Sequence, residues 1–298
     1  MSADQATASG QVSLQASGRV AVRQALSRAS RYVLLFASLI GVAILAYLTY
    51  DTLDKGWSRL SWDFLTNYPS RRAEDAGLRS SIIGSLWVVI TTIILAIPVA
   101  IGTAIWIEEF APRNRFTRLV NLNLANLAGV PSIIYGILGL AVFVRFFGME
   151  TSILAGAFTL ALMITPMTVI TSQEAIRQVP PSIRDGSLAL GASRWQTVWH
   201  HVLPQAAPGM ITGTILAISR AAGETAALIM VGAFAFIAYD NTSVRDDYTT
   251  IPVQIYNWTI RPQAEFRENA AAAIIVLMVG ILSLNLFATI LRERFRSH

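Results

Sequence analysis

Six apolar stretches dominate the pattern of hydrophobic and polar positions along the 298-residue chain. Each is about as long as the roughly 20 helical residues that cross the hydrocarbon core of a bilayer. Pro98 and Pro131 interrupt two of them, which is tolerated where neighbouring helices satisfy the freed backbone groups. The pattern predicts an all-α membrane protein, a helical bundle of six spans. The expected spans are 32–50, 80–107, 119–147, 153–172, 207–238 and 269–291.

The segment 1–31 before the first apolar run contains a polar, patternless stretch and then four arginines. Its first 18 residues are typical of a disordered tail. Basic residues before an apolar run also occur in signal peptides. The run 32–50 is longer than the usual apolar region of a signal peptide, however, and no small-residue cleavage site follows it. We therefore expect a retained first span.

Arginine and lysine residues in the loops predict the orientation of the bundle. With the N-terminus inside, the inner segments carry 13 of these residues and the outer loops carry 8. Six spans then place both termini in the cytosol. The inner segments are 1–31, 108–118, 173–206 and 292–298, and the outer loops are 51–79, 148–152 and 239–268. The core of five spans covers 80–291.

Composition excludes several classes of protein. Hydrophobic residues make up 54% of the chain and charged residues 14%, and the mean hydropathy is +0.52. A soluble domain usually carries about 25% charged residues. The chain has no cysteine and three histidines, too few for a metal site. The net charge of +5 fits arginines on cytosolic loops better than it fits nucleic-acid binding.

The chain lacks a motif for ATP hydrolysis. A phosphate-binding loop needs a lysine after a glycine-rich turn, and the single lysine, Lys55, follows no such turn. Serine-hydrolase and zinc-protease motifs are also absent from the sequence. We expect no enzymatic activity and no cofactor in this chain, so active transport would need a partner or an ion gradient.

Polar residues in two regions indicate more than a simple bundle. Asn121, Asn123 and Asn126 open the third apolar stretch, and we expect them to face the bundle interior or a wet cavity. The long outer loops 51–79 and 239–268 are rich in Trp, Tyr, Pro and Asn. We expect them to be folded and to offer a docking surface, with an ordinary interfacial aromatic belt as the alternative.

The inner loop 173–206 predicts an amphipathic helical hairpin. A first helix should break at Gly191, and a second should end at Pro204. The second helix places an apolar stripe at i, i+3, i+4 and i+7. The stripe consists of Trp195, Val198, Trp199 and Val202, and Arg194 lies off it. Such a hairpin fits a groove on another protein; the alternative is a surface-lying helix with no partner.

The spacing in this loop resembles the EAA loop of binding-protein-dependent ABC importer permeases, which docks on a cytosolic ATPase. Gly191, Leu203 and Pro204 match that motif, and Asp185 keeps its acidic start. Gly186, Ser187 and His201 depart from it. The resemblance implies an importer permease fold of the type I, MetI-like kind, with ATP and Mg²⁺ held by the partner ATPase.

Arg220 and Glu224 are a charged pair near the middle of the fifth apolar stretch. A charge at mid-bilayer costs about 2.5–3.5 kcal/mol on insertion scales, so such residues are candidates for function. Their spacing places both on one face of a continuous helix. Arg220 offers a planar fork of donors to an oxyanion, and Glu224 would temper its charge and accept a hydrogen bond from protonated phosphate. The alternative is a self-neutralising pair that fixes helix packing.

The motif that contains Arg220, Gly223, Glu224 and Thr225 resembles the phosphate importer permeases PstA and PstC. The segment 127–136 resembles both, and the outer segment 251–266 resembles PstA in particular. This resemblance implies a path for phosphate that includes Arg220, Glu224 and Thr225. It also implies a PstC-like permease partner, two PstB-like ATPases and a PstS-like external binding protein in the bacterial inner membrane.

Three other functions stay open from the residues alone. A permease for sulfate or molybdate would use the same arginine. An ion-coupled secondary transporter would usually have internal repeats and more intramembrane acids. A membrane scaffold would have no reason to bear the cost of Arg220.

Overall fold

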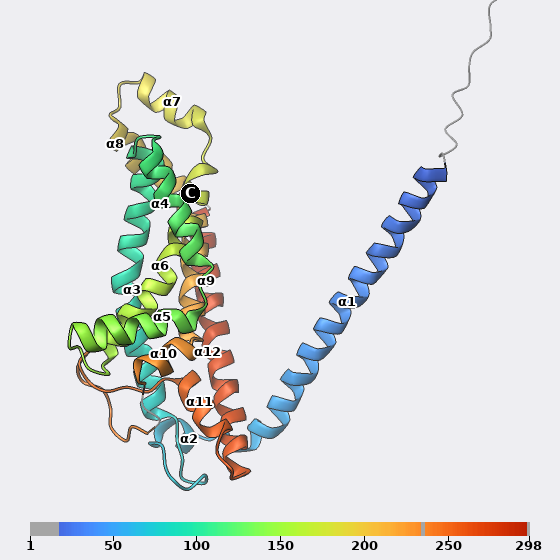
Figure 1. Cartoon of the computed structure of the whole chain (residues 1–298), viewed down its shortest axis with the longest axis vertical. Helices are drawn as coiled ribbons and strands as arrows, with labels where there is room; N and C mark the ends of the chain where they lie inside the picture. Colours follow the sequence, from blue (N-terminus) through green and yellow to red (C-terminus); the bar gives the residue numbers. More distant parts are fainter. Residues whose placement is uncertain (1–17, 234–235, 297–298) are drawn as a thin grey trace, which may run out of the picture. The chain divides into compact units, whose positions relative to one another are not determined.

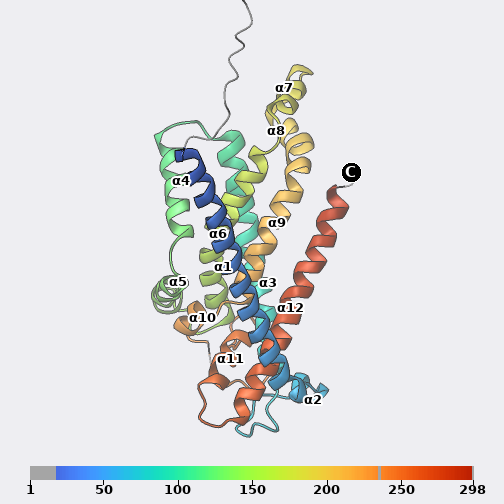
Figure 2. The same cartoon turned by 90° about the vertical axis from the view of Figure 1, so that its right-hand side faces the viewer.

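The computed structural model describes residues 18–233 and 236–296 and is helical throughout most of these ranges, as predicted (Figures 1 and 2). The expected disorder of residues 1–18 falls almost wholly outside the described residues. The helices are α1 (Gly18–Gly56), α2 (Trp62–Thr66), α3 (Arg79–Ile105), α4 (Arg115–Ala128), α5 (Ser132–Gly139), α6 (Ile153–Arg177), α7 (Pro181–Ala189), α8 (Arg194–Thr197), α9 (Leu203–Ala222), α10 (Ala226–Val231), α11 (Ile251–Thr259) and α12 (Glu265–Arg296). Three π-helical segments, Trp106–Phe110, Leu140–Phe146 and Val198–Val202, continue α3, α5 and α8.

The chain divides into two compact units, Met1–Asp51 and Thr52–His298. In the first unit, α1 carries the expected first span without interruption. At about 1.5 Å per residue, its 39 residues exceed the roughly 30 Å of a bilayer core.

Five helical segments of the described chain are long and apolar enough to cross a membrane, and a sixth span arises if one bent pair counts as one. This agrees with the predicted bundle of six spans. In the second unit, α6 is the central helix and packs against α3 on one side and α9 on the other. The helix α12 packs against α9 and α11.

The buried face of α3 is built from small residues at every fourth position. Such residues let helix backbones approach closely, which is the usual basis of helix association in membranes. Close approach of α3 and α6 therefore follows directly from the sequence of α3. The residues of this face are Gly84, Val88, Thr92, Ala96, Ala100 and Ala104.

The third apolar stretch, 119–147, is not one straight helix. Helices α4 and α5 meet at an angle of 102°. Pro131 cannot donate a backbone hydrogen bond, and it disfavours a helical conformation in the residue before it. Across the break, the Tyr135 hydroxyl donates a 2.7 Å hydrogen bond to the carbonyl of Leu127.

The fifth apolar stretch, 207–238, also differs from the expected single span. The helix α9 ends at Ala222, the short α10 follows, and Gly232 ends α10 with a φ of +101°. A left-handed conformation of this kind is the usual role of glycine after a helix. The break between α4 and α5 therefore falls at Pro131, and the break between α9 and α10 falls at Gly223.

The three asparagines of α4 meet the expectation only in part. Asn121 is half-buried and accepts a 2.9 Å hydrogen bond from Gln173 of α6. Asn123 and Asn126 are exposed in this chain, and Asn123 donates to the carbonyl of Leu119.

The two long loops that we expect outside, 51–79 and 239–268, are folded, as expected, and share one apolar cluster. Phe64 of α2 packs on the fully buried Trp258 of α11, with ring centroids 5.9 Å apart. The carbonyls of Val244 and Asp246 accept hydrogen bonds from the first N–H groups of α6. The second loop therefore caps the central helix of the bundle.

Candidate functional site

Arg220 lies in the last turn of α9, beside the break that ends this helix. Its side chain is exposed, and its Nη1 lies 3.7 Å from the sulfur of Met167 in α6. Within the described residues, no carboxylate lies within ion-pair distance of this guanidinium. A cation in an apolar bundle is costly unless it meets an anion or water, so Arg220 is a candidate for binding an anion.

Glu224 lies in the break between α9 and α10 rather than on the face of a continuous helix. The prediction that Arg220 and Glu224 share one helical face is wrong, because α9 ends at Ala222 and Gly223 follows it. The Oε1 of Glu224 accepts a 3.1 Å hydrogen bond from the N–H of Ala227. One carboxylate oxygen thus satisfies an N-terminal donor of α10.

Thr225 precedes α10 and is half-buried. Its carbonyl accepts the first hydrogen bond of that helix, from the N–H of Ile229 at 3.0 Å. The three predicted path residues therefore surround one helix break, and each has a different role in its geometry.

The two helix breaks of the bundle are close together. Helices α5 and α10 pack side by side (Figures 1 and 2). The contact is so tight that a Cβ atom on Gly136 would lie 2.7 Å from the carbonyl oxygen of Ala227. Interrupted helices that expose polar backbone in a membrane protein usually line a cavity or a substrate site. This region combines such breaks with an unpaired arginine.

A polar contact missed by the sequence reasoning lies one residue before Arg220. The Ser219 hydroxyl donates a 2.6 Å hydrogen bond to Oδ1 of Asn285 in α12. Asn285 is a polar residue within the last apolar stretch, and that signal marks it as a candidate. The contact ties the end of α9 to α12.

The predicted coupling loop, residues 173–206, which we call the coupling loop, contains the predicted break but not the predicted end. Helix α7 stops at Ala189, and Gly191 has a φ of +88°, so the break at Gly191 is confirmed. Pro204 does not end the second helix, which continues through α9. The π-helical segment Val198–Val202 is followed by Leu203 and Pro204, so the proline stands in the first turn of α9, where a proline ring is tolerated.

The apolar stripe of the coupling loop divides into a buried and an exposed half. Val198 and Val202 are buried, whereas Trp195 and Trp199 are 60% and 54% exposed. The two indole rings stack with centroids 5.5 Å apart. Leu190, at the tip of the loop, is 91% exposed. Exposed large apolar side chains such as this stacked tryptophan pair are typical of a binding site for another protein.

The remaining predicted loop residues fall into two groups. Asp185 and Gly186 are exposed, as is Pro204, and Leu203 is half-buried. Ser187 is buried and shares a 2.9 Å hydrogen bond with the Thr197 hydroxyl. Ser187, a departure from the EAA motif, therefore joins α7 to α8.

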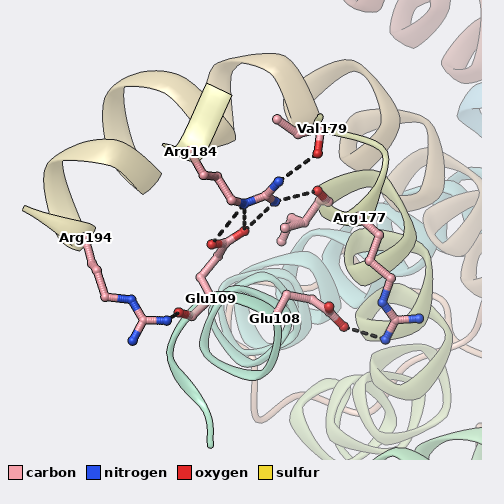
Figure 3. Close-up of polar contacts among 7 residues, drawn as sticks. Glu108, Glu109, Arg177, Val179, Arg184 and Arg194 are labelled. Atoms are coloured by element: carbon pink, nitrogen blue, oxygen red, sulfur yellow. Dashed lines mark hydrogen bonds and ion pairs between the residues drawn. The ribbon is translucent and has the colours of Figure 1, made fainter. Parts of the chain in front are cut away.

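Two glutamates that sequence reasoning did not single out connect this loop to the bundle. Figure 3 shows Glu108 paired with Arg177 and Glu109 paired with Arg184, both at 2.5–2.6 Å. Arg194, a predicted loop residue, donates a 2.7 Å hydrogen bond to the carbonyl of Glu109. The sequence does contain a signal for these two residues, because they are adjacent acids at the end of an apolar stretch.

The comparisons with known proteins agree with this geometry. The family model of the binding-protein-dependent transport system inner membrane component matches residues 96–297. The chain is 31% identical over 264 residues to the probable ABC transporter permease protein YqgI of Bacillus subtilis, covering 84% of this chain and 90% of YqgI. It is 29% identical to the phosphate transport system permease protein PstA of Haemophilus influenzae, covering 84% and 87%.

Solved importers share the fold. A chain of a bacterial alginate ABC transporter superposes with a TM-score of 0.64 at 18% identity, covering 90% of this chain and 96% of its own. A chain of the MetNI methionine transporter gives 0.59 at 16% identity, covering 71% and 94%. The predicted MetI-like importer fold is confirmed. The chain thus belongs to the binding-protein-dependent transport system inner membrane components: it is a non-enzymatic ABC importer permease that works with a substrate-binding protein and with an ATPase that hydrolyses ATP.

Proposed function

We propose that this chain is the PstA-type permease of an ATP-driven importer of inorganic phosphate and forms half of its translocation path. Curated relatives named phosphate transport system permease protein PstA, from Haemophilus influenzae and Mycobacterium tuberculosis, are 29% identical over 84–86% of this chain. The names of these relatives point to phosphate as the substrate, and the residues of the site must explain how phosphate is bound.

The observation that carries the proposal is the exposed, unpaired guanidinium of Arg220 at two adjacent helix breaks. A planar guanidinium donates two parallel hydrogen bonds to an oxyanion. Glu224 lies four residues further along the chain and uses one oxygen to cap α10. The other oxygen is available to accept a hydrogen bond from protonated phosphate, and its charge weakens the hold of Arg220 on the anion.

The partners follow from the same assignment. A PstC-like permease forms the other half of the path, two PstB-like ATPases bind ATP and Mg²⁺, and a PstS-like protein delivers phosphate from outside. The exposed Asn123 and Asn126 of α4 support a second permease subunit, because amide side chains are unfavourable against lipid. The stacked Trp195 and Trp199 support ATPase docking at the coupling loop.

The orientation also belongs to the proposal, with both termini in the cytosol. The end of α12 lies at the same end of the bundle as α7 and α8 (Figures 1 and 2). If the coupling loop faces a cytosolic ATPase, the C-terminus is cytosolic as well. An even number of spans then returns the N-terminus to the same side.

The test is uptake of labelled phosphate by cells that lack this chain and are rescued with wild type, Arg220→Gln, Arg220→Lys or Arg245→Gln. Arg245 is an exposed arginine of the outer loop and serves as the matched control. Arg220→Gln should abolish uptake while the protein still inserts and binds its ATPase. Arg220→Lys should retain part of the uptake, because lysine keeps the charge without the fork.

Sulfate and molybdate serve as competitors in the same assay. Phosphate alone should compete with the label. Normal uptake by Arg220→Gln would refute the role of Arg220, and strong competition by sulfate or molybdate would refute the assignment of phosphate as substrate.

A further inference from the structure

Glu109 is a mostly buried carboxylate at the end of the α3 segment that leads out of the bundle. It belongs to the π-helical segment Trp106–Phe110 and is 9% exposed. Buried carboxylates are rare unless they are paired and hydrogen-bonded. Its position beside the coupling loop raises the question of what its pairing accomplishes.

Arg184 of α7 forms an ion pair with this carboxylate and also donates hydrogen bonds to the end of α6 (Figure 3). Its Nη2 donates to Oε1 of Glu109 at 2.6 Å, and its Nε donates to the same oxygen at 3.1 Å. Its Nη1 donates to the carbonyl of Val179 at 2.7 Å, and Nη2 also reaches the carbonyl of Ile176 at 3.0 Å. One guanidinium therefore joins α3, the C-terminal end of α6, and α7.

The two helices of the coupling loop are tied to one another and to the end of the α3 segment. The hydroxyls of Ser187 and Thr197 connect α7 to α8 at 2.9 Å. Ser193 and Gln196 form a capping box at the start of α8. Arg194 donates to the carbonyl of Glu109. Both helices of the loop thus reach the same residue of α3.

The neighbouring ion pair, Glu108 and Arg177, is more exposed and joins fewer elements. The Arg177 side chain is 56% exposed, and the pair joins α3 only to the last residue of α6. Among the described residues, it makes no side-chain hydrogen bond or ion pair with α7 or α8. The two adjacent glutamates therefore pair with different helices: Glu108 pairs with α6, and Glu109 pairs with α7.

A buried ion pair is weak evidence of a gain in stability, because the cost of removing the charges from water offsets their attraction. Its value lies in fixing one arrangement of the groups that it joins. Movement of the loop at Trp195 and Trp199 would be transmitted to α3 only if the joint between them is stiff. Arg184 provides such a joint through hydrogen bonds in several directions.

We propose that Glu109 and Arg184 are positioning residues that transmit movement of the coupling loop to α3, so that ATP hydrolysis drives transport. The proposal rests on the docking of an ATPase on loop 173–206. Without the joint, the ATPase still binds and still hydrolyses ATP, but the loop moves while α3 lags behind. The expected defect is a loss of coupling rather than a loss of assembly.

The experiment uses the complete importer reconstituted in vesicles with its binding protein and measures phosphate transported per ATP hydrolysed. Glu109→Gln should lower this ratio by at least about 5-fold, the lower end of typical coupling between sites. Arg184→Lys should lower it less, because lysine keeps the charge but cannot span the same acceptors. Glu108→Gln, the matched control, should leave the ratio near the wild-type value.

Two further readouts make every outcome decisive. Co-purification of the ATPase should be unchanged in Glu109→Gln and Arg184→Lys. Loss of the ATPase, or failure of either variant to fold, would show that the pair only maintains structure and would overturn the proposal, as would an unchanged ratio. If the wild-type importer moves no phosphate, the proposed substrate is wrong. Coupling can then still be measured as the stimulation of ATP hydrolysis by the binding protein, compared between wild type and the variants.

Discussion

Replacing Gly136 with alanine perturbs the contact between α5 and α10, the short helices that follow the two breaks. A Cβ atom at this position would lie 2.7 Å from the carbonyl oxygen of Ala227 and 2.8 Å from its Cα. It would also lie 2.8 Å from Cβ of Met230. Ordinary contact begins near 3.4 Å, so α10 would have to move by roughly half an ångström or more.

The free-energy cost follows from two opposing effects. Overpacking of this kind costs about 1–3 kcal/mol. Alanine in place of a helical glycine returns about 0.5–1 kcal/mol through lower chain entropy. The net expectation for Gly136→Ala is a loss of about 1–2 kcal/mol. Gly102→Ala is the matched control, because no atom lies within 4 Å of its added Cβ in α3.

The assay is the apparent unfolding temperature of the purified importer in detergent, followed by tryptophan fluorescence. Gly136→Ala should unfold at a lower temperature than wild type, and Gly102→Ala at an equal or higher temperature. The same chemical change is thus expected to have opposite signs at two positions. Equal unfolding temperatures for the two variants would refute the tight packing of α5 on α10.

Two other residues give predictions that the same unfolding assay can check. Tyr135→Phe removes the hydrogen bond to the Leu127 carbonyl and should destabilise the importer by about 1 kcal/mol; an unchanged unfolding temperature would contradict a role for this bond in the bend. The Arg79 guanidinium beside Asp240 holds the pKa of that carboxyl below its usual range. The pair therefore stabilises the folded protein above the ordinary aspartate pKa of about 3.9. This stabilisation is lost as the pH falls through the lowered pKa. The difference in unfolding temperature between wild type and Asp240→Asn should therefore be constant above about pH 5 and should shrink below pH 4; a difference that grows on acidification would contradict it.

Local features of the sequence were sufficient to predict where the helices lie and where they weaken. The apolar stretches predicted the spans, and Gly191 predicted the break in the coupling loop. The angle of the bend after Ala128 was not predictable in the same way. It depends on how α5 packs against α10, and that packing joins Gly136 to Ala227, which lie 91 residues apart in the chain.

The errors have the same physical origin. Arg220 and Glu224 were placed on one helical face because their spacing fits a regular helix, yet the helix ends between them at Ala222. The sequence predicts a helix end at Pro204, because the π-helical turn before it has no sequence signature of its own. Glu109 was overlooked because its importance depends on Arg184, 75 residues further along the chain.

The π-helical segment Val198–Val202 has a consequence for the divergence of this family. A π turn closes its hydrogen bond one residue later than an α turn, so it accommodates one extra residue without breaking the helix. A single-codon insertion or deletion at this point changes the angular offset between the exposed surface at Trp199 and the span that begins at Leu203. We expect relatives with a regular α-helix here to align with a one-residue gap and to present the corresponding surface rotated relative to the membrane helices. Family members could in this way adjust to ATPases of different shape while the bundle itself stays unchanged.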